Sequence, residues 1–315
     1  MSLLYPAGQT PYCTVPELIA APTGISWSTI PPYKGTTPAQ TTAEQVNILG
    51  RSTAQVDAYT NQILRATLDT EQISGPDYRV TVMTGVGNGR VILSRWPVLS
   101  ITGVQVAPNG VFPRQWTTVP AGYYDIEHPV LGVYDSVAPS DSGDGGQSIV
   151  ISPGYVNWCG GRNGVLLRVS YVNGWPHTSL TSNAAAGAQT ITVDDCTGWA
   201  ITGEFGVTGA AGTIYDSGQQ ETVQVTAASA TAGPGTLSLS SPLTFGHTTG
   251  TMVTTLPQSV IQATILFSAA QALTRGATST TIHAIPGTGS NSGSKNAADF
   301  VADAKCLLHP LRRTI

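Results

Sequence analysis

The chain has 315 residues, only 10% of which are charged, and it contains 35 glycines and 21 prolines. This composition argues against a long helical or coiled-coil protein, which would be rich in Glu, Lys and Leu. A hydrophobic fraction of 41% is enough for a packed core and argues against simple disorder. The net charge of −4 provides no cationic field of the kind that nucleic-acid-binding proteins use.

Neither a membrane span nor a secretory leader is expected. No apolar run reaches the roughly 18 residues that a membrane-spanning helix needs. The segment from Met1 to Pro16 lacks a basic region followed by an apolar one. The cysteines form no CxxC pair, and we expect four free thiols in a reducing compartment: Cys13, Cys159, Cys196 and Cys306.

The acidic residues are unevenly distributed along the chain. All five charged residues of segment 178–255 are acidic, so this segment carries −5 and the rest of the chain +1. The change in charge coincides with a change in composition, and it predicts a module inserted between residues 1–177 and 256–315. Short alternating segments predict that the insert is a small all-β barrel or sandwich, with strands at 189–193, 204–208, 221–226, 236–240 and 251–254.

The part of the chain before the insert is expected to begin with two helices and to continue as strands. A short helix is predicted near Thr14, and a capping-box pattern at Thr41 and Glu44 predicts a second helix that reaches about Leu68. Segment 136–147, rich in Ser, Asp and Gly, reads as an exposed loop. The clearest strand patterns lie at residues 78–82, 90–93, 100–106 and 164–172.

Two further helices are predicted after the insert. The first opens at Pro257 and ends before Gly276, and it is apolar on more than one face, so we expect it to be buried between elements or between subunits. A Gly- and Ser-rich tether at 287–294 leads to a last helix at 296–309, followed by a basic tail. Together these elements predict an α+β fold.

No catalytic, cofactor or metal site is predicted. The sequence lacks GxSxG, HExxH and P-loop motifs, and Gly85 to Gly89 reads as a hairpin turn rather than a dinucleotide fingerprint. Asp141 and Asp144 lack the further ligands of a calcium loop. The histidines are dispersed, with none at the i, i+4 spacing of a zinc-binding helix: His128, His177, His247, His283 and His309. We therefore expect no enzyme.

Four segments, taken in order, resemble bacteriophage head–tail connector (adaptor) proteins. Residues 91–104, VILSRWPVLSITGV, are similar to that family's L-x-R-x-P-V-x-S-V-x-x-V strand, with Ile101 in place of its second Val. Residues 167–176, LRVSYVNGWP, resemble its V-x-Y-x-x-G-x-P strand. Residues 257–276 resemble the apolar helix that follows, and CLLHPLR at 306–312 resembles the family's L-L-x-P-x-R ending.

The resemblance implies a helical adaptor core with antiparallel β elements and an inserted all-β domain. It also implies a structural virion protein that is made in the host bacterial cytoplasm and forms a ring, typically of twelve subunits, beneath the portal protein. Such a ring connects head to tail, extends the channel through which viral DNA passes without specific binding, and meets a tail, stopper or tail-terminator protein.

The resemblance also implies candidate contact residues, and it involves no cofactor. The tether and last helix would dock on the portal through Phe300, Leu307, Leu308, Leu311, Arg312 and Arg313. The apolar helix would pack between ring subunits through Val260, Ile261, Ile265, Leu266 and Leu273.

Two other functions stay open at this point. One is a tail, baseplate or fibre component that uses the β-domain to bind a host surface or a partner. The other is a wall-degrading hydrolase, for which the sequence offers no catalytic carboxylate or cysteine–histidine arrangement.

Overall fold

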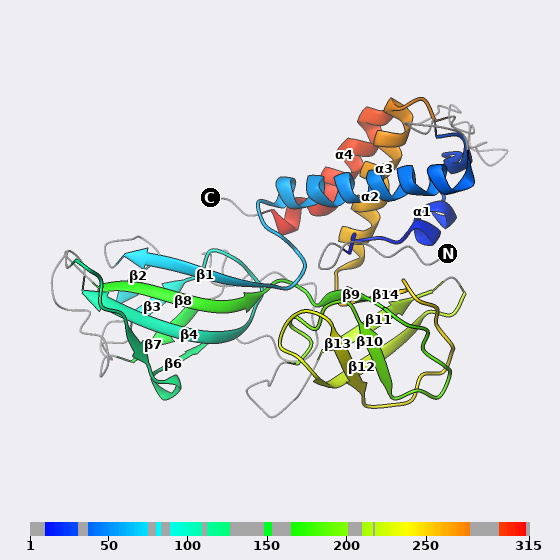
Figure 1. Cartoon of the computed structure of the whole chain (residues 1–315). Helices are drawn as coiled ribbons and strands as arrows, with labels where there is room; N and C mark the ends of the chain where they lie inside the picture. Colours follow the sequence, from blue (N-terminus) through cyan, green and yellow to red (C-terminus); the bar gives the residue numbers. More distant parts are fainter. Residues whose placement is uncertain are drawn as a thin grey trace, which may run out of the picture.

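Three antiparallel β-sheets and four α-helices form the described part of the chain (Figure 1). The computed structural model describes residues 10–30, 37–74, 80–82, 89–108, 112–126, 148–152, 165–200, 210–216, 218–277 and 296–312. The helices lie together in one group, while the sheets form two β units beneath it in this view (Figure 1). The expected α+β fold built on a helical adaptor core is wrong. Most of the described elements are antiparallel β-strands, with 14 strands in three sheets and only four α-helices.

The first helix lies where the sequence predicts it, whereas the second begins and ends earlier than predicted. Helix α1 (Val15–Ala20) is confirmed, with Thr14 and Glu17 forming a capping box. Helix α2 (Pro38–Thr60) is capped by Thr37 rather than Thr41, and it ends at Asn61, which adopts a left-handed φ of 58°. The prediction that this helix reaches Leu68 is wrong, because Leu68 belongs to a strand that pairs with a later strand.

The last two helices confirm the predicted boundaries. Helix α3 (Gln258–Thr274) is followed by Gly276 at a φ of 90°, and helix α4 (Ala297–Leu308) begins with an Asn296–Asp299 capping box. A buried hydrogen bond of 2.9 Å from Ser268 Oγ on α3 to Ser52 Oγ helps to hold α3 against α2. Three short 3-10 helices are described as well: η1 (Trp27–Thr29), η2 (Ala121–Tyr123) and η3 (His309–Leu311).

Two four-stranded sheets pack face to face as a sandwich. Their orders are β1-β8-β4-β5 and β2-β3-β7-β6. Their inward side chains, such as Leu167, Val104 and Ile149, form one buried core. The strands at 78–82, 90–93, 100–106 and 164–172 are confirmed in position. The bounds are β1 (Thr67–Ser74), β2 (Val80–Val82), β3 (Gly89–Ile92), β4 (Val98–Pro108), β5 (Thr117–Val119), β6 (Tyr124–Ile126), β7 (Ser148–Ile151) and β8 (Val165–Asn173).

The third sheet is curved and has its own core. Its order is β10-β13-β12-β11-β14-β9, and a bridge between Leu180 and Val193 connects its two edges. Side chains that include Trp199, Ile214 and Val225 fill its interior. The bounds are β9 (His177–Ser179), β10 (Thr190–Val193), β11 (Ala211–Tyr215), β12 (Glu221–Ala228), β13 (Gly235–Leu239) and β14 (Met252–Thr254).

Four of the five strands predicted within 178–255 are confirmed by β10, β12, β13 and β14, whereas β9 and β11 were missed. The strand predicted at 204–208, the loop at 136–147 and the tether at 287–294 lie outside the described residues. Among the described cysteines, Cys13, Cys196 and Cys306 are free, and Cys159 lies outside these ranges. None of the described helices has both the length and the apolar character that crossing a bilayer demands.

Candidate functional site

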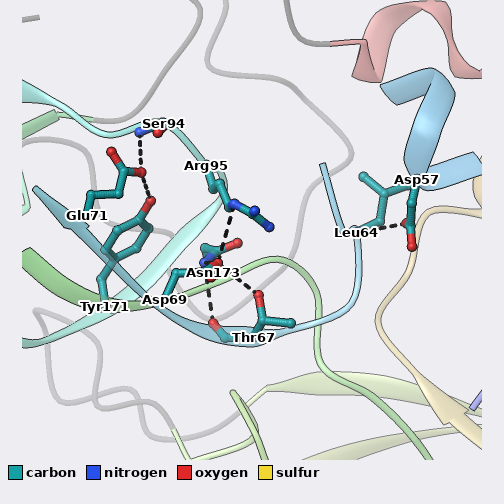
Figure 2. A network of polar contacts seen from close by, with 9 residues as sticks. All are labelled: Asp57, Leu64, Thr67, Asp69, Glu71, Ser94, Arg95, Tyr171 and Asn173. Atoms are coloured by element: carbon teal, nitrogen blue, oxygen red, sulfur yellow. Dashed lines mark hydrogen bonds and ion pairs between the residues drawn. The ribbon is translucent and has the colours of Figure 1, made fainter. Parts of the chain in front are cut away.

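A network of polar side chains lies where β1, β8 and the β3–β4 connection meet (Figure 2). Glu71 of β1 accepts hydrogen bonds from the Tyr171 hydroxyl and, at 2.8 Å, from the Ser94 backbone N–H. Burial, followed by the nearby Glu71 charge, raises the pKa of Tyr171 far above its usual value. The phenol therefore stays protonated and acts as a donor.

Asp69, two residues earlier on β1, is held by a second set of donors (Figure 2). Its Oδ2 lies 2.6 Å from Asn173 Nδ2, 3.1 Å from Thr67 Oγ1 and 3.5 Å from Arg95 Nε. Asp69 and Glu71 project from the same face of the strand, because alternate residues share a face.

Most donors around these carboxylates come from other segments of the same β unit. Each carboxylate contacts one residue of β8 and one residue of the β3–β4 connection, and Tyr171 and Asn173 of β8 are fully buried. The hydroxyls of Tyr171 and Thr67 each donate to one of the two carboxylates. The network fixes β1 against β8 and against the segment that leads into β4.

A related contact joins the helices to β1. The Tyr12 hydroxyl donates to Asp57 Oδ1 at 2.5 Å, and the Leu64 N–H donates to the Tyr12 oxygen at 3.0 Å. Burial raises the pKa of Asp57, although the hydrogen bonds from Tyr12 and Leu64 oppose this shift. The end of α2 is thereby fixed to the start of the sandwich.

His177 joins the segment before α1 to the curved sheet. Its Nδ1 lies 2.9 Å from Thr254 Oγ1, and its Nε2 lies 2.9 Å from the Pro11 carbonyl oxygen. A carbonyl only accepts, so Nε2 carries the proton and Nδ1 accepts from the Thr254 hydroxyl. Burial lowers the pKa of His177 to about 4, which keeps the ring neutral near pH 7.

A second buried histidine lies inside the curved sheet's unit. The side chain of His247 is 0% exposed, with Nε2 2.7 Å from Glu221 Oε1 and Nδ1 3.4 Å from Asp216 Oδ2. Burial alone would raise the pKa of Glu221, but hydrogen bonds from Thr244, His247 and Phe245 lower it overall. This cluster anchors the β11–β12 connection to the segment that precedes β14.

A groove of about 950 Å³, here called the acidic groove, separates α1 and α3 from the β11–β12 connection. Its lining combines apolar side chains such as Ile261 and Ile265 with the carboxylates of Glu17 and Asp216. Burial raises the pKa of Glu17 despite opposing hydrogen bonds from its own cap. Burial and the Glu17 charge together raise the pKa of Tyr215, in the groove wall, to about 12.

A second groove, of about 550 Å³ and here called the α4 groove, lies where α2, α3 and α4 meet. Ala298, Val301 and Ala302 of α4 line it together with Gln271 of α3. Lys305 is the sole charged residue among its described lining residues. The two grooves therefore carry opposite charge.

The five residues expected to pack between ring subunits lie in or against the core of a single chain. Val260, Ile261, Ile265 and Leu266 are at most 8% exposed, and Leu273 is partly buried. Their side chains fill the space between α3 and its neighbouring helices. Direct contact with a neighbouring subunit through these side chains stays a prediction.

The residues expected to dock on the portal differ in how exposed their side chains are. Phe300, Leu308 and Leu311 are at most 3% exposed and pack in the same core as α3, while Leu307 is partly buried. Arg312 is exposed, with its guanidinium 5.5 Å from the centre of the Tyr59 ring. Arg313 lies outside the described residues. Arg312 is the described residue of this set that a partner could reach most directly.

Sequence reasoning missed the polar network, the two buried histidines and both grooves. A signal for the network existed, because Asp69 and Glu71 alternate with Leu68 and Thr70 in a two-residue period. The histidine contacts had no local signal, since His177 and Pro11 are 166 residues apart.

Comparisons with known proteins add no identification. Family models, curated proteins and solved structures yield no match to the chain. Within the described residues, no group of three or more His, Cys, Asp or Glu could hold a metal ion.

Proposed function

We propose that the chain is a structural protein of the bacteriophage virion, a head–tail connector that forms a ring beneath the portal. The ring, of about twelve copies on the family's pattern, would extend the DNA channel and meet a tail or stopper protein. This places the protein in the neck of the virion. It requires no cofactor, and DNA passes through without specific binding.

The observation that carries the proposal is the spatial pairing of the four resembling segments. Strand β4, from the first segment, pairs with β8, from the second, over the register Val98↔Asn173 to Pro108↔Val165. Helix α3, from the third segment, packs against α4, which leads into the fourth. Segments that are far apart in sequence and share one family's pattern thus form two contacting pairs.

The placement of the curved sheet also fits a connector with an appended module. His177 of β9 lies opposite Thr254 of β14, so the chain enters and leaves the unit at adjacent positions. Protein domains are commonly inserted through such adjacent ends. The acidic charge of segment 178–255 suits a unit that decorates the neck or meets a basic partner, and it disfavours a grip on DNA.

Capture of this protein by the portal protein tests the proposal. Arg312 is the residue to change, because its side chain is exposed. The full-length protein should co-purify with its portal protein, and Arg312→Glu should reduce that capture by about tenfold, because a cation at the contact would become an anion. Arg51→Glu, at an exposed position on α2, is the matched control and should bind like the wild type. Deleting α4 is a poorer test, since Phe300 and Leu308 belong to the core.

Equal capture of the wild type and Arg312→Glu would move the portal contact to another surface. Absence of capture of the wild type, together with binding to host-cell envelopes, would favour the tail or fibre component instead.

A further inference from the structure

The two grooves lie on opposite sides of α3. Gln258, Gln262 and Ile265 line the acidic groove, whereas Ala270 and Thr274 line the α4 groove. At about 100° per residue, the five α3 residues that line the acidic groove span roughly 160° of the helix and the three that line the α4 groove span roughly 100°, with the middles of the two arcs roughly 150° apart. One copy therefore presents two different grooves in two different directions.

The exposed face of α4 beside the second groove has a charge opposite to that of the first groove. Ala298, Ala302 and Lys305 are spaced i, i+4 and i+7, so they share one face of α4, and all three are exposed. Lys305 brings a positive charge, while the acidic groove has Glu17 and Asp216 and no Lys, Arg or His among its described lining residues.

We propose that neighbouring copies of this chain meet head to tail, with the Lys305 face of α4 from one copy seated in the acidic groove of the next. This inference rests on the proposed function, because it names the contact that builds the proposed ring. A closed ring is built from a heterologous interface, which joins two unlike surface patches that point in different directions on each copy.

Charge and apolar area contribute differently to this contact. Pro16 and Ala20 are exposed apolar residues of the groove's lining, against which the small side chains of Ala298 and Ala302 would bury surface. Lys305 would then reach Glu17 or Asp216 at the rim, where complementary charge fixes orientation and rejects the reverse arrangement.

Cross-linking tests the contact directly, between variants in which the introduced cysteine is accessible while the native Cys13 and Cys196 stay buried. Gln262→Cys lies in the acidic groove and Ala302→Cys lies on the α4 face, and both positions are exposed. Each is made with Cys159→Ser and Cys306→Ser, assembled, and treated with a short bis-maleimide. A mixture of the two variants should yield covalent dimers, whereas either variant alone should yield none, because each link joins two unlike surfaces.

The control variant is Ala54→Cys, at an exposed position of α2 that lines neither groove. It should form no link with either partner. Efficient linking of Gln262→Cys to itself would overturn the proposal in favour of a two-fold contact. Rings that form and yield no link in the mixture would also overturn it.

Lys305 variants give an independent readout that does not depend on cross-linking geometry. Lys305→Glu should weaken assembly, so that rings dissociate at a protein concentration about tenfold higher than for the wild type. For Lys305→Arg this concentration should stay within about twofold of the wild-type value. Assembly of Lys305→Glu that equals the wild type would contradict the proposed contact. If the wild type forms no ring with or without portal, the proposed function itself fails, and this contact fails with it.

Discussion

His177 Nδ1 and Thr254 Oγ1 lie 2.9 Å apart, and the two residues face each other across the paired strands β9 and β14. The other ring nitrogen of His177 contacts the Pro11 carbonyl at 2.9 Å, and its ring packs edge-on against Tyr12. One side chain thus closes the entry to the curved sheet and fixes that sheet to the residues before α1. The position of the curved sheet therefore depends on the two hydrogen bonds of the His177 imidazole.

The first prediction concerns acid. The folded state holds the pKa of His177 at about 4, against 6.5 for the unfolded chain, so between these values only the unfolded state binds the proton. Stability is therefore fully present above pH 6.5 and falls as the pH drops toward 4, by up to about 3 kcal/mol. Denaturant unfolding between pH 7 and pH 4 measures this loss.

His177→Gln is the control for that prediction, because an amide can still donate to Pro11 but does not titrate. Its free energy of unfolding should be lower than that of the wild type at pH 7, and the gap should shrink as the pH approaches 4. A gap that stays constant with pH would show that folding does not lower the pKa of His177.

The second prediction concerns Gly174, which follows β8 with a φ of +89°. A Cβ at this position would lie 2.5 Å from the Arg65 carbonyl oxygen, which is backbone and has little freedom to move. Gly174→Ala should lower the free energy of unfolding by about 3 kcal/mol, because backbone strain and a steric clash both apply.

Gly187 separates these two effects. Its φ of +86° is similar, but nothing lies within 4 Å of the point that a Cβ would occupy there. Gly187→Ala should therefore cost only the backbone strain, about 1 kcal/mol. Thermal unfolding of both variants measures the loss in the free energy of unfolding. Equal losses for the two variants would mean that the close approach to Arg65 contributes nothing to the cost of Gly174→Ala.

The third prediction concerns the Glu71–Tyr171 contact. Tyr171→Phe removes one donor from the Glu71 carboxylate, to which the Ser94 N–H also donates, and should cost about 1–3 kcal/mol. In a double-mutant cycle with Glu71→Gln, the two losses should be less than additive, because the residues share one interaction. Strictly additive losses would argue that the contact is not energetically coupled.

The fourth prediction concerns removal of the curved sheet. Replacing residues 178–253 with Asn-Gly should leave a folded protein, because His177 and Thr254 already face each other as antiparallel partners. Circular dichroism should show the helical signal retained, with one cooperative unfolding transition. Assembly should weaken, since Tyr215 and Asp216 would no longer form a wall of the acidic groove. A protein that loses its cooperative transition would show instead that the sheet is integral to the fold.

Local patterns predicted those elements whose boundaries depend on local chemistry. The start of α1 near Thr14 and the Gly276 stop after α3 both depend on neighbours in sequence. The predicted extension of α2 failed because Asn61 turns left-handed and Leu68 pairs with Val172, a residue remote in sequence. Pairing of this kind overrides a helical spacing of apolar residues.

The candidate surfaces were less predictable than the elements. The portal and ring residues were chosen as apolar or basic side chains on two helices, but most of the apolar ones pack in the chain's own core. Sequence pattern shows that a helix face is apolar and does not show which element will cover it. The acidic groove exists only because α1, α3 and the β11–β12 connection converge.

Mass measurement under native conditions, on the full-length protein alone and mixed with its portal protein, tests the connector proposal most directly. The account predicts a ring of about twelve copies, either alone or once portal is added, and a complex that contains both proteins. A monomer or a trimer that ignores the portal would contradict it.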